Sequence, residues 1–376
     1  MSDEVTLVAT AAMGLESIVA AEVRKLGYQV NVENGKVIFN APPSAIPRCN
    51  LWLRSADRVK LLVGQFKAVT FDELFEATKA LPWEHFITEE GKFPVAGNSV
   101  KSTLHSVPDC QAIVKKSIAE RLKLKYGVAG KMPETGALYK VEIAIHKDHA
   151  TLTIDTSGTG LHKRGYRLGQ GEAPLKETMA AALVQLTNWK PDHPFVDPFC
   201  GSGTIPIEAA LIGQNIAPGF NRDFASENWD WVKSRHWENA FEEAEDHANY
   251  DQELHITGSD IDQRMINIAK ENAMEAGLGD LISWKQMQVR DLSIRKPSGY
   301  LVGNPPYGQR IGDQEDASKL YQELGKVMKD HPSWSVYILS AFERFEQKYG
   351  EKATKKRKLF NGYIQTNYYQ YFGKKQ

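Results

Sequence analysis

The turn Asn304-Pro305-Pro306-Tyr307 contains the residue types that most clearly suggest chemistry. It follows Tyr300-Leu301-Val302, an apolar run typical of a buried parallel strand, and the two prolines must end that strand. Ligands of open α/β sheets bind at the carboxyl ends of the strands. The Asn304 amide oxygen and the Pro305 carbonyl could accept both protons of an NH2 group, and an exposed Tyr307 ring could stack on the base that carries it. We interpret the turn as a site that methylates an exocyclic amino group; an ordinary proline turn is the alternative.

A glycine-rich turn within Phe195–Thr204 is the second candidate. Its glycines let the backbone approach a ligand closely, and the helix expected to start after them offers free N–H groups. Pro206 stands where a dinucleotide-binding fingerprint would need its third glycine, so NAD is disfavoured. Cys200 lies in the same turn, but no nearby residue would activate it as a nucleophile, so we expect it to pack.

Asp260 ends the next apolar run and is the third candidate. A carboxylate at the end of the second strand of such a sheet can accept hydrogen bonds from both hydroxyls of a ribose. We expect Asp260 to have this role, Ile261 to pack on the adenine, and Asp262 to cap the helix that runs to Gly277.

The glycine-rich turn resembles motif I of the class I S-adenosylmethionine-dependent methyltransferases. In that family the strand-end acid and the glycine loop hold the methionine part of the cofactor. The matching residues here are Asp197, Phe199, Gly201, Gly203 and Thr204. Class I enzymes usually place an Asp after the third strand, on the adenine amine; Gln288 stands there in this chain, and Asp291 follows three residues later. The resemblance implies S-adenosylmethionine as the cofactor and requires no metal.

Strands and helices alternate in the back half, which is typical of a doubly wound α/β sheet. We expect strands at the glycine-rich turn, at 256–260, 282–286 and 335–339, and before Asn304. Helices are predicted at 173–189, 205–213 and 318–330, the first with Lys176 and Glu177 on its surface. Asn361-Gly362 between apolar runs predicts a terminal hairpin. The resemblance implies the seven-stranded, Rossmann-like class I sheet.

The front of the chain has the pattern of small α+β units. Strands are expected at 7–10, 37–39, 59–66, 99–104, 139–146 and 150–155, and helices at 14–26, 46–55, 71–80 and 109–126. This order, with the closing run 152–158, resembles the ferredoxin-like segment and THUMP domain of RNA-modifying enzymes. The resemblance implies four parts: a ferredoxin-like segment (1–65), a THUMP RNA-binding domain (66–157), a linker (158–172) and a methyltransferase domain (173–376).

Two further segments have open interpretations. The helix expected at 109–126 carries five basic residues between 115 and 125, opposed there only by Glu120, which fits either a solvated face or an RNA contact. The basic residues are Lys115, Lys116, Arg121, Lys123 and Lys125. Residues 215–250 are longer than an ordinary connection and rich in Trp, so we expect an inserted helical lid or wall.

Composition sets the remaining bounds. The 376 residues are 42% hydrophobic and 25% charged, which is typical of a globular protein with two or three domains. The sequence lacks a long apolar run, a basic leader and a zinc pattern, and it has three widely spaced cysteines. We therefore expect a cytoplasmic protein without membrane or metal, as a monomer or weak dimer. Residues 1–167 carry 22 Lys and Arg against 18 Asp and Glu, which weakly favours a polyanionic partner for the front half.

The whole chain resembles the bacterial THUMP-containing guanine-N2 RNA methyltransferases, particularly those of 23S rRNA. That resemblance implies methylation of the 2-amino group of a guanine in structured RNA. A tRNA guanine-N2 methyltransferase and a non-catalytic RNA-binding assembly factor remain alternatives. Adenine-N6 methylation of DNA and glutamine-N5 methylation of proteins use the same Asn-Pro-Pro-Tyr turn, but the front of the chain argues against both.

Overall fold

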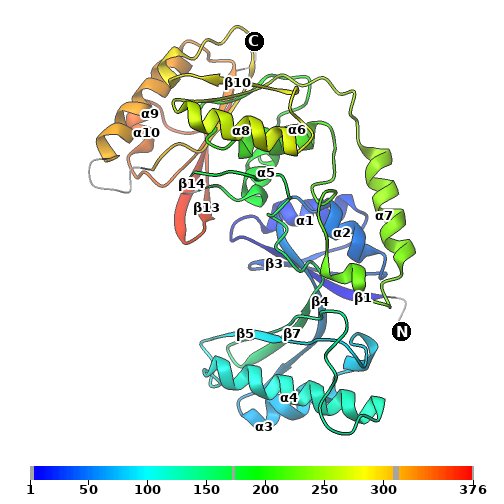
Figure 1. Ribbon diagram of the computed structural model, residues 1–376. Coiled ribbons are helices and arrows are strands. Elements are labelled where there is room, and N and C mark those ends of the chain that lie inside the picture. Colours follow the sequence, from blue (N-terminus) through cyan, green and yellow to red (C-terminus); the bar gives the residue numbers. More distant parts are fainter. Residues whose placement is uncertain (1–3, 172–173, 308–312, 375–376) are drawn as a thin grey trace.

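The computed structural model describes residues 4–171, 174–307 and 313–374. It contains two seven-stranded sheets, one in the front half of the chain and one in the back half. Figure 1 shows them in separate lobes, with the back half above and residues 68–155 at the bottom. Among the described residues no helix is both long enough and apolar enough to cross a membrane.

The front sheet has the strand order β2-β3-β1-β4-β7-β6-β5. Its strands are β1 (Val5–Ala11), β2 (Asn31–Glu33), β3 (Lys36–Ala41), β4 (Ala56–Lys67), β5 (Val95–Val100), β6 (Val141–His146) and β7 (His149–Asp155). The long strand β4 pairs with β1 through its first half and with β7 along most of its length. The two α+β units therefore share one continuous sheet through β4.

The front helices are α1 (Glu16–Lys25), α2 (Ala45–Trp52), α3 (Phe71–Ala80), the 3-10 turn η1 (Trp83–His85) and α4 (Val107–Tyr126). Helix α3 begins with a capping box in which Thr70 and Glu73 satisfy each other's backbone N–H groups. The strand expected at 99–104 is wrong by several residues. It ends at Val100, because Lys101 has a φ of 51° and the Ser99 hydroxyl donates to the Leu104 carbonyl, which turns the chain.

The back sheet has the order β10-β9-β8-β11-β12-β14-β13. Its strands are β8 (Phe195–Asp197), β9 (Ile256–Asp260), β10 (Ile282–Gln286), β11 (Gly299–Gly303), β12 (Trp334–Ser340), β13 (Lys355–Asn361) and β14 (Ile364–Tyr371). The first five strands in this order are parallel, and the β13–β14 hairpin adds antiparallel strands at one edge. This confirms the expected class I sheet with its terminal hairpin.

Helices cover both faces of the back sheet. They are α5 (Glu177–Gln185), α6 (Thr204–Gly213), α8 (Gln263–Glu275), α9 (Asp313–Lys329) and α10 (Phe345–Tyr349), with the 3-10 turn η3 (Val289–Asp291). Neighbouring strand residues alternate between the two cores: Val302 packs with α5 and α6, whereas Leu301 packs with α9 and α10. Because both faces are buried at the centre of the sheet, β11 and β12 are nearly continuous apolar runs without an alternating pattern.

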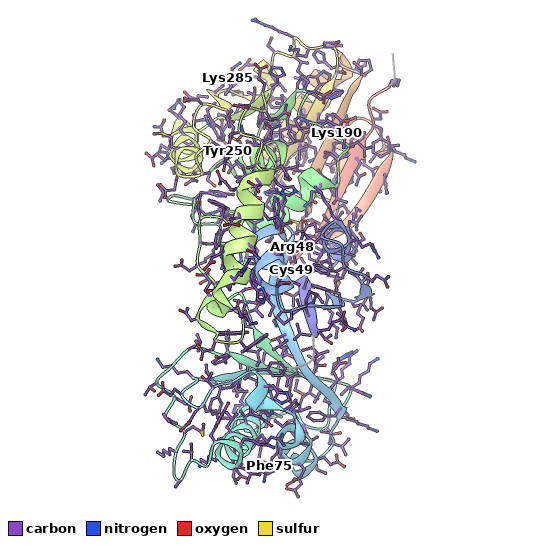
Figure 2. All side chains as sticks on the ribbon, turned by 90° about the vertical axis from the view of Figure 1, so that its right-hand side faces the viewer. Arg48, Cys49, Phe75, Lys190, Tyr250 and Lys285 are labelled. Carbon is purple, nitrogen blue, oxygen red and sulfur yellow. The ribbon has the colours of Figure 1, made fainter. Side chains whose placement is uncertain are left out.

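The inserted segment 215–250 is partly helical, as expected, and packs on the front lobe. It forms η2 (Ala225–Asn228) and α7 (Ser234–His247), and α7 runs alongside α2 (Figures 1 and 2). Trp229 stacks on Tyr139 with ring centroids 4.9 Å apart. Arg48, labelled in Figure 2, donates two hydrogen bonds of 2.6 Å to Glu243. Burial of large aromatic rings such as Trp229 and Trp237 stabilises the contact of this segment with the front lobe.

Candidate active site

The Asn304–Tyr307 turn leaves β11 at the carboxyl edge of the back sheet. Gly303 allows this edge to form: a Cβ there would come within 2.9 Å of the Phe199 ring and 3.5 Å of Asp197 Oδ1. The Tyr321 hydroxyl of α9 donates to the Pro306 carbonyl at 2.6 Å and lies 3.1 Å from Ser340 Oγ. The turn is therefore anchored from behind by α9 and β12.

Tyr307 is half-buried, so the expectation of an exposed ring is wrong. Its hydroxyl donates to Asn304 Oδ1 at 2.5 Å and accepts a longer hydrogen bond of 3.4 Å from Asn361 Nδ2 in the β13–β14 hairpin. Burial raises the pKa of this hydroxyl, which keeps it protonated as a donor. These two hydrogen bonds form a relay in which Asn361 donates to Tyr307 and Tyr307 donates to Asn304. The relay holds the Asn304 amide oxygen toward Tyr307, and the second lone pair of that amide oxygen can accept from another donor. Among the described residues, none donates to the Pro305 carbonyl.

The glycine-rich turn connects β8 to α6. Asp197 is only 1% exposed, and its Oδ1 accepts the Phe199 N–H at 2.9 Å. Gly201 and Gly203 have φ values of 51° and 86°, which a side chain would strain. At Gly203 a Cβ would also lie 2.7 Å from the Trp284 ring, whereas at Gly201 it would point into open space. Gly201 therefore faces the volume where a ligand can lie.

Asp260 connects the second strand to this turn. Its Oδ2 accepts the Gly201 N–H at 3.0 Å and its Oδ1 accepts the Asp262 N–H at 2.9 Å. Burial raises the pKa of Asp260, and burial together with the Asp260 charge raises the pKa of Asp197 well above its usual range. Two such carboxyls beside an open turn fit a ligand with positive charge and hydroxyl donors. S-adenosylmethionine has both, as a sulfonium, an ammonium and a ribose.

A cavity of about 200 Å³ unites the two motifs. Its walls include Asp197, Phe199, Gly201 and Thr204 from the glycine-rich turn and Asn304 from the proline turn. Residues 197–204 and 304 are far apart in the sequence, and the parallel pairing of β8 with β11 brings them together. The site can therefore hold a ligand of the glycine-rich turn directly against the Asn304 amide.

The remaining predicted contacts lie toward the β9–β10 side of the edge. Ile261 is 63% exposed just beyond β9, Gln288 is partly buried after β10, and Asp291 is exposed in η3. Asp262 caps α8 through the Arg264 N–H, as predicted. The carboxyl ends of β9 and β10 are adjacent, so Ile261 and Gln288 stand beside Asp260 in the same part of the edge.

Cys200 is buried in the cavity wall against the backbone of β9. Its N–H donates to the Ser259 carbonyl at 2.9 Å, and its Cβ approaches the position that a Cβ on Gly258 would take. Burial, with the charges of Asp197 and Asp260, raises the pKa of its thiol well above the usual range. Such a thiol is a poor nucleophile, which agrees with a packing role.

Family models match nearly the whole chain. A model described as an RMKL-like methyltransferase domain matches residues 164–370, one described as an RlmL ferredoxin-like domain matches 6–60, and a THUMP domain model matches 68–155. The chain belongs to the RMKL-like methyltransferase family. The THUMP and ferredoxin-like resemblances of the front half are confirmed with it.

Relatives in this family differ in length. The Bacillus subtilis (strain 168) protein named "Putative RNA methyltransferase YpsC" is 64% identical over 98% of this chain and 96% of its own length. The Shewanella sp. (strain W3-18-1) "Ribosomal RNA large subunit methyltransferase K/L" is 32% identical over 95% of this chain. This chain spans about half the length of that relative, 51%.

Two solved structures have nearly the same fold. One, described as "a predicted N6-adenine-specific DNA methylase from Listeria monocytogenes str. 4b F2365", is 64% identical with a TM-score of 0.95, and the match covers 99% of this chain and 97% of that one. The other, described as "SMU.472, a putative methyltransferase complexed with SAH", is 48% identical with a TM-score of 0.96 over the full length of both chains. Family membership therefore does not by itself name the methylated atom.

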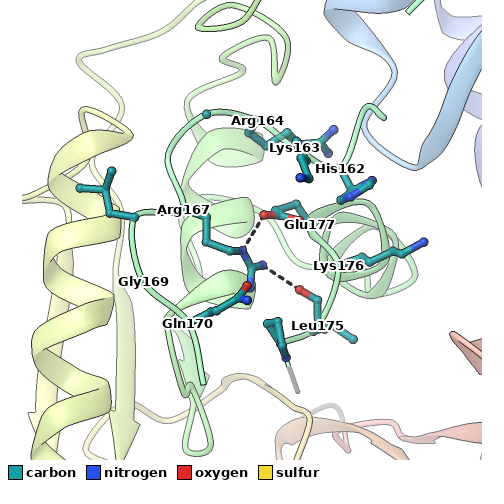
Figure 3. A pocket seen from close by; sticks show the side chains of 12 residues that line it. His162, Lys163, Arg164, Arg167, Gly169, Gln170, Leu175, Lys176 and Glu177 are labelled. Atoms are coloured by element: carbon teal, nitrogen blue, oxygen red, sulfur yellow. Dashed lines mark hydrogen bonds and ion pairs between the residues drawn. The ribbon is translucent and has the colours of Figure 1, made fainter. Parts of the chain in front are cut away.

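The sequence did not predict that the segment preceding α5 packs against the candidate site. Glu177, expected on the surface, is buried, and it accepts a 2.7 Å hydrogen bond from Arg167. Arg167 also donates to the Leu175 carbonyl at 2.8 Å (Figure 3). It donates to Thr204 Oγ1 at 3.1 Å as well. The predicted linker thus packs against the glycine-rich turn. The signal available in the sequence was the run of basic residues at 162–167.

The basic helix α4 is less available to RNA than its sequence suggests. Lys115 pairs with Glu134 at 2.6 Å, and Arg121 pairs with Glu84 at 2.6 Å. Lys125 lies 3.7 Å from the same Glu84. Two acids from other elements therefore pair with three of the five basic residues of α4 and neutralise part of its charge run.

Proposed function

We propose that this chain transfers a methyl group from S-adenosylmethionine to the exocyclic 2-amino group of a guanine in structured RNA, with 23S rRNA as the favoured substrate. The observation that carries the proposal is the shared cavity, which places Asn304 beside the glycine-rich turn. An Asn side chain and a following prolyl carbonyl suit an NH2 group, because both are acceptors.

The cofactor residues follow from the carboxyls and the open turn. Asp197, Phe199, Gly201, Gly203 and Thr204 would hold the methionine part. Asp260 would accept the ribose hydroxyls, with Ile261, Gln288 and Asp291 toward the adenine. S-adenosylmethionine supplies an electrophilic methyl group on its sulfonium. The SAH in complex with the 48% identical protein is the product form of this cofactor and supports the assignment.

The catalytic residues act on the amine. Its lone pair is delocalised into the guanine ring, which makes it a weak nucleophile. Asn304 Oδ1 and the Pro305 carbonyl would accept its two protons and favour a more tetrahedral nitrogen as the bond forms. The Tyr307 hydroxyl holds the Asn304 amide, and its ring offers a surface for the extruded base. Most of the rate gain then comes from orientation.

The front lobe supports RNA over DNA or protein as the substrate. Residues 6–60 and 68–155 match the RlmL ferredoxin-like and THUMP models, and the curated relatives are named for RNA or ribosomal RNA. We propose that residues 1–157 present the RNA and 173–376 perform the chemistry, in the cytoplasm. The Listeria protein, described as a DNA adenine methylase, supplies a second candidate, because the Asn304 turn would also suit an adenine 6-amino group.

Nucleoside analysis tests the proposal. The purified chain is incubated with tritiated S-adenosylmethionine and, separately, unmodified 23S rRNA, tRNA and DNA, and the labelled nucleoside is identified by mass spectrometry. We expect N2-methylguanosine from 23S rRNA, and loss of one such residue in a deletion strain. Label only in tRNA would name the tRNA alternative, and N6-methyladenine in DNA would refute RNA as the substrate. Binding of RNA without label would identify an assembly factor.

A further inference from the structure

A second cavity, of about 530 Å³, lies beside the cofactor cavity and has no role in the chemistry described above. It lies between two stretches of chain, 162–170 and 174–177 (Figure 3). Pro174 and Leu175 line both cavities, so a single stretch of chain separates them.

The lining of this cavity is strongly basic. Arg164 is committed to structure, because it lies 3.3 Å from the buried Glu208 and donates to the Arg54 carbonyl at 2.5 Å. Lys163 and Lys176 are exposed, and neither forms an ion pair within the described parts of the chain. Lys163 thus remains available to a ligand, and so does Lys176, although its charge also acts on the nearby carboxyl of Asp57.

Arg167 and His162 also line this cavity. One guanidinium nitrogen of Arg167, Nη1, is buried without a hydrogen-bond partner among the described residues. Burial, followed by the charges of Lys176, Lys163 and other nearby cations, lowers the pKa of His162 to about 4. The imidazole is therefore neutral at physiological pH and can donate one hydrogen bond without adding charge.

Lys176 connects this cavity to the target-base side of the site. It also lines a third cavity, of about 440 Å³, bounded by Met13 of the front lobe and by Asn361 and Tyr363 of the hairpin. Asn361 donates to the Tyr307 hydroxyl. An anion held by Lys163 and Lys176 would therefore lie between the cofactor wall and the turn that receives the base.

We propose that the cavity lined by residues 162–170 and 174–177 binds a backbone phosphate of the RNA next to the target nucleotide. This inference rests on the proposed function. Phosphate contacts fix the register of a nucleic acid, and a base that leaves its stack needs its backbone held at that point. The α-carboxylate of the cofactor has similar chemistry. We favour the phosphate because Lys176 also faces the cavity shared by both lobes.

The test is the salt dependence of RNA binding by the full chain. Lys163→Gln, Lys176→Gln and the double variant are compared with Lys190→Gln, an exposed lysine near the amino end of β8 and away from the catalytic edge (Figure 2). Each lost phosphate contact should make the slope of log Kobs against log salt shallower by about 0.7 to 0.9. Because both lysines hold the same phosphate, we expect each single variant to lose part of this one contact and the double variant to lose all of it. The double variant should also show a higher KM for RNA and keep its melting temperature and its affinity for S-adenosylmethionine.

One more variant and the possible outcomes of these measurements decide the assignment. Lys176→Arg should keep the wild-type slope of log Kobs against log salt, because the positive charge of the side chain, and not its packing, determines that slope. Unchanged slopes in both glutamine variants would overturn the proposal, and so would a selective loss of S-adenosylmethionine affinity, since the cavity would then hold the cofactor carboxylate. RNA binding is measured without turnover, so the salt slopes test the phosphate site independently of methyl transfer. A wild-type chain that binds RNA but transfers no methyl group would refute the proposed function without deciding the phosphate site.

Discussion

Replacing Tyr307 by Phe removes one oxygen from the relay that orients the catalytic amide. The hydroxyl donates to Asn304 Oδ1 at 2.5 Å and accepts from Asn361 at 3.4 Å, while the ring stays in place. A neutral hydrogen bond of this kind contributes about 0.5 to 1.5 kcal/mol net. If the whole contribution is felt in the transition state, turnover falls about 2- to 13-fold.

Two other variants provide the comparison for the loss of turnover expected in Tyr307→Phe. Asn304→Ala removes the acceptor itself and should lower turnover about 100- to 1000-fold, by analogy with one preorganised polar group at a reacting centre. Tyr307→Ala also removes the ring, which could stack on the base for about 1 to 3 kcal/mol, so it should weaken RNA capture as well as turnover. All three variants should bind S-adenosylmethionine as the wild type does.

The assay is single-turnover transfer of tritiated methyl to unmodified RNA, with calorimetry for the cofactor and a thermal melt for folding. Tyr307→Phe that is as slow as Asn304→Ala would refute the orienting role, because the hydroxyl itself would then take part in the chemistry. A faster Tyr307→Phe enzyme would refute it differently, since the hydroxyl would be competing with the substrate amine for Asn304 Oδ1. A stably folded Asn304→Ala chain with normal turnover would end the amino-methylation hypothesis.

Four other outcomes follow from the structure. Asp260→Ala should weaken S-adenosylmethionine binding about 10- to 150-fold, from loss of about 1.5 to 3 kcal/mol of charge-assisted hydrogen bonding, and unchanged calorimetric affinity would remove it from the site. Because the pKa of Asp197 is raised, its carboxyl gains a proton at a higher pH than an exposed acid does, and cofactor affinity should fall as the pH decreases through that range. Asp197→Asn should flatten this pH profile of cofactor affinity. An equally steep profile in Asp197→Asn would show that another group titrates. Trp229→Ala should cost about 3 to 5 kcal/mol of unfolding free energy in denaturant titrations, against about 0.5 or less for the exposed Tyr250→Ala, and similar values for the two would contradict the role of the inserted segment in the front core. Glu208→Ala leaves the buried Arg164 charge without its partner and should cost about 3 to 5 kcal/mol, whereas a loss below about 1 kcal/mol would show that this pair is not a determinant of stability.

Local sequence determined the two motifs and the elements that carry them. Prolines after an apolar run end a strand, closely spaced glycines permit a tight backbone approach, and Asn-Gly closes a hairpin, whatever the rest of the chain does. Strand β11, helix α6 and the β13–β14 hairpin follow from these short-range rules. The class of sheet follows as well, because alternating strands and helices have few right-handed arrangements.

Only the tertiary structure decided which of these residues meet. Asn361 reaches Tyr307 across 54 residues, and Gly303 fits against Phe199 because β8 and β11 pair side by side. The sequence showed Glu177 as one more charged residue, yet it is buried because Arg167 comes back to meet it. The same holds for the Trp-rich insertion at 215–250. Its Trp content predicts that it is buried, but not which surface it packs against. Hydrogen bonds and aromatic contacts form between residues that are neighbours in space. The pairing of strands that are distant in the sequence decides which residues become neighbours, so a short stretch of sequence does not reveal these contacts.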